Sequence, residues 1–252
     1  MFHALARSRL PALLACVLLL AGCRRGSPPS QQQSPAPPFA SSQPGDMQDA
    51  RPRIIALGDS LTAGLGLLEM QAYPALLQEK IDDEGYKFAV VNAGVSGDTS
   101  AAGLQRLDWA LDGDVKILIL ELGANDGLRG LPPAEMKKNL AAIIERSQQR
   151  GISVLLLGME APPNFGNEYA VSFRQVYREL ARQYRVTFVP FMLDNVAGHG
   201  DLNQRDGIHP NVQGTRIVAD TVWNALKPML DAVPTDQHGS TPVAIGVFSV
   251  AS

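Results

Sequence analysis

IIALGDSLT, residues 54–62, joins a β-branched apolar run to a glycine, an aspartate and a serine. Gly58, Asp59 and Ser60 are common where a strand ends, because each tolerates or caps bent backbone. The same residues are also suited to holding a nucleophilic hydroxyl between a strand and a helix. This stretch alone fits both interpretations, so the rest of the chain must separate them.

Apolar runs alternate with helical segments from Arg53 onward. The predicted strands are Arg53–Leu57, Phe88–Asn92, Val115–Leu122, Ile152–Met159 and Val186–Pro190. The predicted helices are Tyr73–Asp83, Ser100–Leu111, Pro133–Arg150, Glu168–Tyr184 and Asn211–Leu230. Because strands such as ILILEL are apolar almost throughout, both faces of the sheet should be covered. The alternation predicts an α/β fold, a three-layer α/β/α sandwich with a five-stranded parallel sheet.

Polar or glycine-rich segments follow all five predicted strands. They are Gly58–Leu61, Asn92–Thr99, Gly123–Gly127, Glu160–Asn164 and Asp206–Pro210. Ligands of open parallel sheets bind outside the carboxyl ends of the strands. Any one of these segments would suit a turn, but all five on one edge predict a site.

Acyl transfer needs a nucleophile, a base and a group that orients the base. Ser60 can supply the nucleophile. His209 is the best base, because His199 and His238 lie in polar, glycine-flanked sequence. Asp206 precedes His209 by three residues and can fold its carboxylate back to Nδ1, which would fix the tautomer. By itself the Asp206–His209 pair is ambiguous, since it also suits the start of a helix.

The expected oxyanion donors are the backbone N–H groups of Ser60 and Gly97 and the side-chain amide of Asn125. Glycine suits a place where backbone must approach the substrate without a Cβ. The neighbouring acids are expected to shape the loops rather than to react: Asp126 in a tight turn, and Asp59 and Asp98 as loop braces.

Two loops on the same edge are predicted to bind the acyl chain beside Ser60. Residues 127–133 carry Leu128 and Leu131, and residues 162–169 carry Pro163 and Phe165. The alternative is that both are ordinary surface loops whose apolar residues pack onto neighbouring helices.

The four blocks together resemble those of the SGNH (GDSL) hydrolases: GDSL at 58–61, the loop glycine at 97, GxND at 123–126 and DxxHP at 206–210. Longer strings such as ELGANDGLRGL and DGIHPN resemble the branch of bacterial arylesterases and multifunctional acyl-CoA thioesterase/lysophospholipases. The resemblance covers about residues 53–231. It implies a flavodoxin-like sheet and a serine esterase in which Ser60, Gly97, Asn125 and His209 carry the family roles and Asp206 completes the triad.

The first 52 residues are predicted to be a targeting segment and a tether. Arg7 and Arg9 precede an apolar stretch too short to span a bilayer, and LAGC at 20–23 resembles the bacterial lipobox. Residues 1–22 would then be a lipoprotein signal peptide, and Cys23 would carry the lipid. Residues 23–52 form a Pro/Ser/Gln-rich tether, 53–231 the hydrolase domain and 232–252 a tail. An ordinary secretory signal is the alternative.

Composition limits the partners. The formal charge is −3 and no basic block lies beyond the N-terminus, so nucleic acid is not expected. Both cysteines, Cys16 and Cys23, lie before residue 25 and histidines are few, so neither a metal site nor any other cofactor is expected. The expected partners are a small acyl ester or lysolipid substrate and, through the lipid anchor, a membrane.

The sequence therefore predicts a lipid-anchored ester hydrolase of the bacterial cell envelope, facing the periplasm, that cleaves short- to medium-chain acyl esters through an acyl-serine. One alternative is a carbohydrate O-deacetylase, for which exposed aromatic residues would argue. Trp109 and Trp223 instead fall inside predicted helices at core-like spacing. The other alternative is a non-catalytic envelope-binding lipoprotein.

Overall fold

In the computed structural model, which describes residues 51–233, five parallel strands form one sheet in the order β2-β1-β3-β4-β5. The strands are β1 (Arg53–Gly58), β2 (Ala89–Gly94), β3 (Val115–Glu121), β4 (Ser153–Leu157) and β5 (Thr187–Val189). The predicted parallel sheet is thus confirmed. The predicted signal peptide, nearly all of the tether and all but the first two residues of the tail lie outside the described residues.

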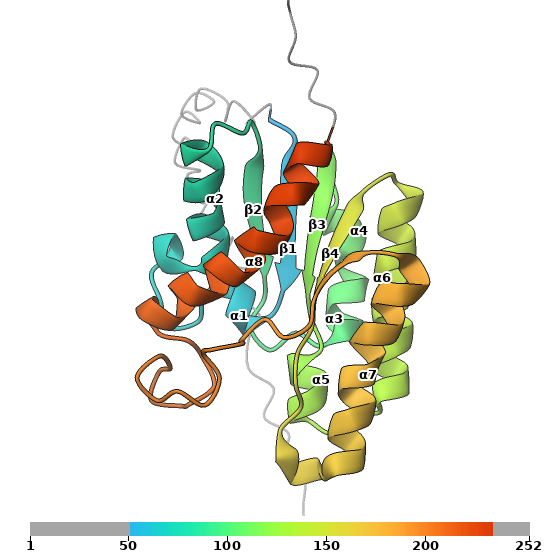
Figure 1. The fold of residues 1–252 in the computed structure, drawn as a ribbon. Coiled ribbons are helices and arrows are strands. Elements are labelled where there is room, and N and C mark those ends of the chain that lie inside the picture. Colours follow the sequence, from blue (N-terminus) through green and yellow to red (C-terminus); the bar gives the residue numbers. More distant parts are fainter. Residues whose placement is uncertain (1–50, 234–252) are drawn as a thin grey trace, which may run out of the picture. The chain divides into compact units, whose positions relative to one another are not determined.

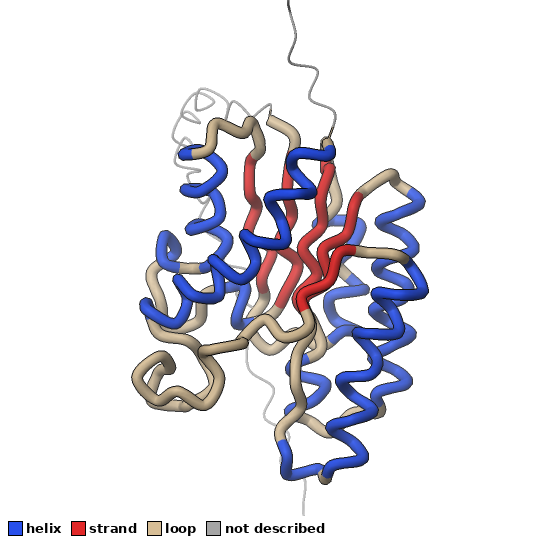
Figure 2. The backbone as a smooth tube through the Cα atoms, in the orientation of Figure 1, coloured by secondary structure: helices blue, strands red, loops and turns tan. Residues whose placement is uncertain are grey.

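Helices cover both faces of the sheet (Figures 1 and 2). On one face α2 (Tyr73–Asp83) packs beside α8 (Val212–Ala232). The other face carries α3 (Ser100–Gln105), α4 (Leu107–Ala110), α6 (Pro133–Gln149) and α7 (Asn167–Tyr184). Three short elements follow the carboxyl ends of β1, β3 and β4, namely α1 (Ser60–Ala63), α5 (Ala124–Leu128) and the 3-10 turn η2 (Pro163–Phe165). A second 3-10 turn, η1 (Glu69–Gln71), lies between α1 and α2.

The core lies between the sheet and these helices. Residues 117–120 of β3 and 155–157 of β4 are fully buried, as expected for strands covered on both faces. Helix α7 presents Phe173, Tyr177 and Leu180 to the core at the three- and four-residue spacing of one helical face. Each such side chain contributes about 1.5–3 kcal/mol by leaving water. This packing fixes the strand ends from which the site is built.

Two details differ from the sequence prediction. The predicted helix Ser100–Leu111 is broken at Arg106 into α3 and α4. Trp109, expected in the core, is 75% exposed, whereas Trp223 is 9% exposed and packs as predicted. Helix α4 contains Trp109 and leads into the amino end of β3, so this indole lies away from the carboxyl edge of the sheet.

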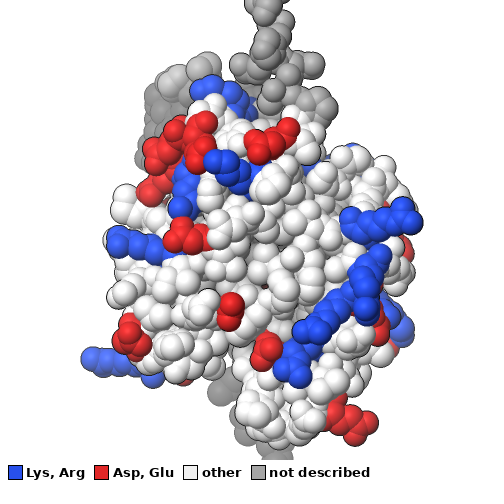
Figure 3. Space-filling model, in the orientation of Figure 1, with Lys and Arg blue, Asp and Glu red and all other residues white. Residues whose placement is uncertain are grey.

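The surface drawn in Figure 3 carries acidic side chains interspersed among the basic ones. Lys137 pairs with Glu179 at 2.7 Å and Arg174 with Glu160 at 3.5 Å. Such exposed pairs contribute little to stability, typically about 0–1 kcal/mol. None of the helices between residues 51 and 233 has both the length and the apolar composition needed to cross a membrane.

Candidate active site

Ser60 is the first residue of α1, directly beyond the end of β1. Asp59 caps this helix, since its Oδ1 accepts a hydrogen bond from Leu61 N at 3.0 Å. A Cβ on Gly58 would lie 2.0 Å from Thr62 Oγ1 and 2.7 Å from the carbonyl oxygen of Glu121, so no larger residue fits. The strand-to-helix turn therefore serves to hold the Ser60 hydroxyl at the sheet edge.

The loop between β5 and α8 brings a histidine to this hydroxyl. Nε2 of His209 lies 2.9 Å from Ser60 Oγ, and Nδ1 lies 2.8 Å from Asp206 Oδ2. The predicted trio, separated by 149 residues between Ser60 and His209, is thus assembled in space. The turn that links Asp206 and His209 is itself held by backbone: Asp206 Oδ1 accepts hydrogen bonds from the N–H groups of Ile208 and His209.

Asp206 is an ionised acceptor. The two backbone hydrogen bonds, from His209 and Ile208, and the side-chain bond to His209 lower the pKa of Asp206 to about 2. Because a carboxylate can only accept, Nδ1 of His209 must carry the hydrogen in this contact. Nε2 is then free to accept the proton of Ser60, which is the arrangement that a general base requires.

Gln204, which the sequence analysis did not single out, fixes the loop of His209 to the loop after α1. Its side-chain Nε2 donates to the carbonyl oxygens of Leu65 at 2.7 Å and Pro210 at 3.0 Å, while its backbone N donates to His209 O at 2.8 Å. Asn211 then caps α8 by accepting hydrogen bonds from the backbone of residues 213 and 214. These contacts hold His209 beside Ser60.

The two other predicted oxyanion donors follow β2 and β3, the strands on either side of β1. Gly97 has φ +89°, a conformation that L side chains rarely adopt, and its carbonyl oxygen accepts a hydrogen bond from Arg129 Nη2 at 2.8 Å. Among residues 51–233 its N–H donates to no acceptor. Asn125, in α5, donates one Nδ2 hydrogen to Asp59 Oδ2 at 3.0 Å. The second Nδ2 hydrogen can be donated to a bound oxyanion.

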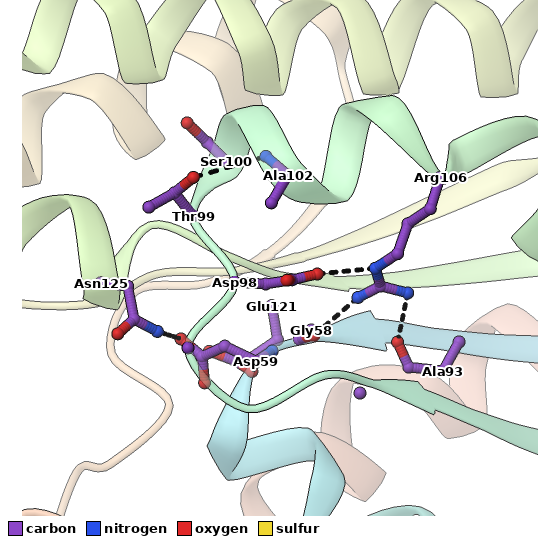
Figure 4. Close-up of polar contacts among 12 residues, drawn as sticks. Gly58, Asp59, Ala93, Asp98, Thr99, Ser100, Ala102, Arg106, Glu121 and Asn125 are labelled. Carbon is purple, nitrogen blue, oxygen red and sulfur yellow. Dashed lines mark hydrogen bonds and ion pairs between the residues drawn. The ribbon is translucent and has the colours of Figure 1, made fainter. Parts of the chain in front are cut away.

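Arg106 holds together the strand ends and the loop beneath the site, a role that the sequence analysis missed (Figure 4). Its guanidinium donates to Asp98 Oδ2 at 2.6 Å, to Ala93 O at 2.7 Å and to Gly58 O at 2.9 Å. One side chain therefore ties the ends of β1 and β2 to the loop that carries Gly97. Asp98 braces its loop through this pair, as predicted.

The prediction that Asp126 lies in a tight turn was wrong. It lies inside α5 and is 3% exposed, and its carboxylate accepts hydrogen bonds from Ser100 N at 2.8 Å and Ser100 Oγ at 2.7 Å. The carboxylate thus joins the start of α3 to α5. The sequence offered no signal for this, because the two partners lie in different helices, 26 residues apart.

A cavity of about 540 Å³ opens beside the hydroxyl of Ser60 and is also lined by Asn125 and His209. Much of its wall is apolar, including Leu61, Leu128, Met159, Pro163, Phe191 and Leu193.

Two of the four predicted substrate residues, Leu128 and Pro163, thus line the cavity, whereas Leu131 and Phe165 do not. Phe165 instead packs against Tyr169, with ring centroids 5.3 Å apart, and Tyr169 donates a hydrogen bond to Leu131 O at 2.8 Å. Leu131 and Phe165 therefore stabilise the two loops through Tyr169, which does not line the cavity.

No group of three or more His, Cys, Asp or Glu side chains within the described part of the chain is arranged to hold a metal ion. The side chains of Asp206 and His209 do meet, but they form a hydrogen bond to each other. The site therefore combines a hydroxyl, a base and amide donors around a largely apolar cavity.

Residues 56–217 match the sequence model of the GDSL-like lipase/acylhydrolase family. The chain is 45% identical over 184 residues to Esterase TesA of Pseudomonas aeruginosa, covering 73% of this chain and 92% of that esterase. It is 36% identical over 179 residues to thioesterase 1/protease 1/lysophospholipase L1 of Escherichia coli K12, covering 71% and 85%. The structure of the psychrotrophic esterase EstA from Pseudoalteromonas sp., inhibited by monoethylphosphonate, matches with a TM-score of 0.68 and 34% identity, covering 71% of this chain and 98% of EstA.

Proposed function

This chain belongs to the GDSL-like lipase/acylhydrolase family, and we propose that Ser60 is its nucleophile and carries the acyl intermediate. The chain is a carboxylic ester hydrolase. The observation that supports the assignment best is the continuous path from Asp206 to His209 to Ser60, with contacts of 2.8 and 2.9 Å.

The reaction follows from the direction of these contacts. Ser60 Oγ attacks the ester carbonyl carbon while its proton passes to Nε2 of His209. Asp206 stabilises the imidazolium that forms. His209 then gives the proton to the leaving alcohol or thiol as the carbon–oxygen or carbon–sulfur bond breaks. Water attacks the acyl-serine by the same steps, which releases the acid and restores Ser60.

The tetrahedral intermediate needs donors for its oxyanion. We assign the backbone N–H groups of Ser60 and Gly97 and the side-chain amide of Asn125. A single preorganised donor of this kind contributes about 2.7–4 kcal/mol to transition-state stabilisation. One Nδ2 hydrogen of Asn125 is donated to Asp59, and the other Nδ2 hydrogen is left for the substrate.

The proposed substrates are short- to medium-chain acyl esters. An apolar cavity of about 540 Å³ lies within the range typical of small-molecule sites. The names esterase and thioesterase/lysophospholipase carried by the relatives support aryl and alkyl esters first, with thioesters and lysophospholipids as further candidates. The exposed Trp109 does not favour a carbohydrate substrate, because it lies away from the edge that carries Ser60.

The test is turnover of p-nitrophenyl acetate and butyrate by the full-length protein, followed by labelling with an alkyl phosphonate. Ser60→Ala should lower kcat by several orders of magnitude. Ser96→Ala, a change at an exposed serine in the neighbouring loop, is the matched control and should leave turnover intact. A phosphonate adduct mapped by mass spectrometry to any residue other than Ser60 would falsify the assignment.

We further propose that the chain is a lipoprotein anchored through Cys23 in the bacterial cell envelope, facing the periplasm. The support is the sequence alone, LAGC at 20–23 followed by the tether, since these residues lie outside the described part. Cys23→Ser should abolish lipid attachment, and Cys16→Ser is the control. Detergent-phase partitioning and mass measure the outcome; a Cys23→Ser protein that still partitions with an unaltered mass would refute the anchor.

A further inference from the structure

Two fully buried carboxyl groups lie beside the proposed nucleophile, and the reaction steps above use neither. Asp59 immediately precedes Ser60, and Glu121 is the last residue of β3. The backbone N–H of Asp59 donates to Glu121 Oε2 at 3.1 Å, so the two residues are in direct contact (Figure 4). Two ionised carboxylates at such a site would repel each other without water to screen them. The charge of this pair therefore requires an explanation.

Glu121 makes hydrogen bonds in the pattern of a neutral acid. Its Oε2 accepts two, from Asp59 N at 3.1 Å and from Thr62 Oγ1 at 2.8 Å. Among residues 51–233 its Oε1 makes none. In a neutral carboxyl group Oε2 would be the accepting carbonyl oxygen and Oε1 would carry the proton. An unpaired O–H dipole on Oε1 costs less than an unpaired carboxylate oxygen, because burying a charge without a donor is the more unfavourable of the two.

The surroundings of Glu121 also favour the neutral form. Burial, and after it the charge of Asp59, raise the pKa of Glu121 well above its usual value. The other titratable groups that face it are the phenols of Tyr73 in α2 and Tyr177 in α7, and burial raises the pKa of both. Neither phenol brings a positive charge. Asp59 faces it from the β1–α1 turn.

Asp59, in contrast, should be ionised, because both of its carboxylate oxygens must accept hydrogen bonds. Its Oδ1 accepts from Leu61 N and its Oδ2 from Asn125 Nδ2, both at 3.0 Å. Burial raises the pKa of Asp59, while these donors, the neighbouring Glu121 and the nearby His209 lower it. Were Asp59 to carry a proton on Oδ2, it would donate to the Asn125 amide and turn that amide around. The carbonyl oxygen of Asn125 would then take the place of the NH₂ group that the oxyanion needs.

We propose that Glu121 is a positioning residue that acts as a neutral acid: it leaves the single negative charge of the pair on Asp59, and Asp59 orients the Asn125 amide toward the oxyanion. The inference rests on the proposed ester hydrolysis and adds two residues that work only through Asn125. Neither Asp59 nor Glu121 touches the substrate.

The first experiment compares two variants of Glu121 by the kcat/KM of p-nitrophenyl butyrate against pH. Glu121→Gln is neutral, nearly isosteric and able to accept both hydrogen bonds, so it should keep kcat within about fivefold. Glu121→Leu lacks the acceptor and should lose kcat by tenfold or more with little change in KM. The acid limb of the Gln variant should coincide with that of the wild type. Loss of an ionised carboxylate would instead move that limb to lower pH, because negative charge near His209 favours its protonated form.

His209 is faced by Asp206 from its own loop and by Asp59 and Ser60 from the β1–α1 turn. Asp59→Asn removes a charge from that set, so its limb should move to lower pH. It should do so while the limb of Glu121→Gln stays in place. This pair of results identifies the member that carries the charge.

The second experiment is a double-mutant cycle. Asn125→Ala alone should lower kcat by about 10²–10³-fold, as loss of one oxyanion donor does. Asp59→Asn should cost about tenfold or more in the wild-type background and almost nothing when Asn125 is already alanine, because Asp59 acts through that amide. Thermal unfolding of every variant checks the fold, and the Gln variant and the cycle carry the test where Glu121→Leu does not fold.

Three results would overturn the inference while leaving the proposed function intact: an inactive but folded Glu121→Gln, an acid limb of that variant at lower pH, or an equal cost of Asp59→Asn in both backgrounds. A wild-type protein without ester turnover would instead refute the proposed function, and this inference with it.

Discussion

Leu128 should read the length of the acyl chain, and Leu131 in the same loop should not. Leu128 lines the cavity and is 42% exposed, so part of its side chain is available to a bound acyl chain. Alanine removes three carbons, each contributing about 0.8 kcal/mol when fully covered. Scaled by the exposed fraction, the loss is about 1 kcal/mol, or roughly fivefold in kcat/KM.

The assay is kcat/KM for p-nitrophenyl esters from acetyl to decanoyl. Leu128→Ala should lower the value about fivefold for octanoyl esters and leave acetyl esters almost unaffected, since an acetyl group is too short to reach it. Leu131→Ala is a matched control, because that side chain is 38% exposed and does not line the cavity. An equal loss for all chain lengths in Leu128→Ala, or a chain-length-dependent loss in Leu131→Ala, would refute the assignment of this wall.

Three further changes test the rest of the site. Asp206→Asn should lower kcat by about 10²-fold or more. Because backbone hydrogen bonds hold the pKa of Asp206 at about 2, this carboxylate should stay ionised throughout the assay range, and an NMR carboxyl signal of Asp206 that titrates above about pH 4 would contradict this. Arg106→Lys keeps a charge for Asp98 but loses the carbonyl hydrogen bonds, so urea denaturation should show about 2 kcal/mol less stability, whereas Arg129→Lys, which changes one exposed bond, should cost under about 1 kcal/mol. Prolonged EDTA treatment should leave ester turnover unchanged, and a loss restored by divalent metal would disprove a metal-free reaction.

The sheet and most helix limits could be predicted because they follow from local pattern. Runs such as ILILEL are apolar on both faces, which only a covered parallel strand explains well. Helix Tyr73–Asp83 was predicted at its observed limits, and the others of more than eight residues within about two residues. The trio of Ser60, Asp206 and His209 was also accessible from sequence, since strand ends must meet at one edge.

The contacts that hold the site together were not accessible in the same way. Arg106 is one cation in a helical pattern, and its carbonyl acceptors belong to β1 and β2. Its role also explains the broken helix, because the break lies at the residue that reaches across to both strands. The prediction that Trp109 is buried was wrong, because helical spacing does not determine which side of a short helix faces the core. Asp126 was misread because its acceptor role depends on Ser100, 26 residues away.

GDS at 58–60 is both a strand-to-helix turn and part of the candidate active site, because the same atoms of Asp59 serve both. Asp59 caps α1 with one carboxylate oxygen and holds Asn125 with the other, so the cap cannot be exchanged for another capping residue without disturbing the amide. Serine or threonine would cap the helix equally well. Neither has a second acceptor oxygen. A carboxylate is therefore required at a fully buried position where burial disfavours it, and Glu121 can stand beside it only if it is neutral. Gly58, Asp59 and Ser60 thus meet the ordinary requirements of a strand-to-helix turn. The buried negative charge of Asp59 is not needed for a turn, and it marks the part of this turn that serves the reaction.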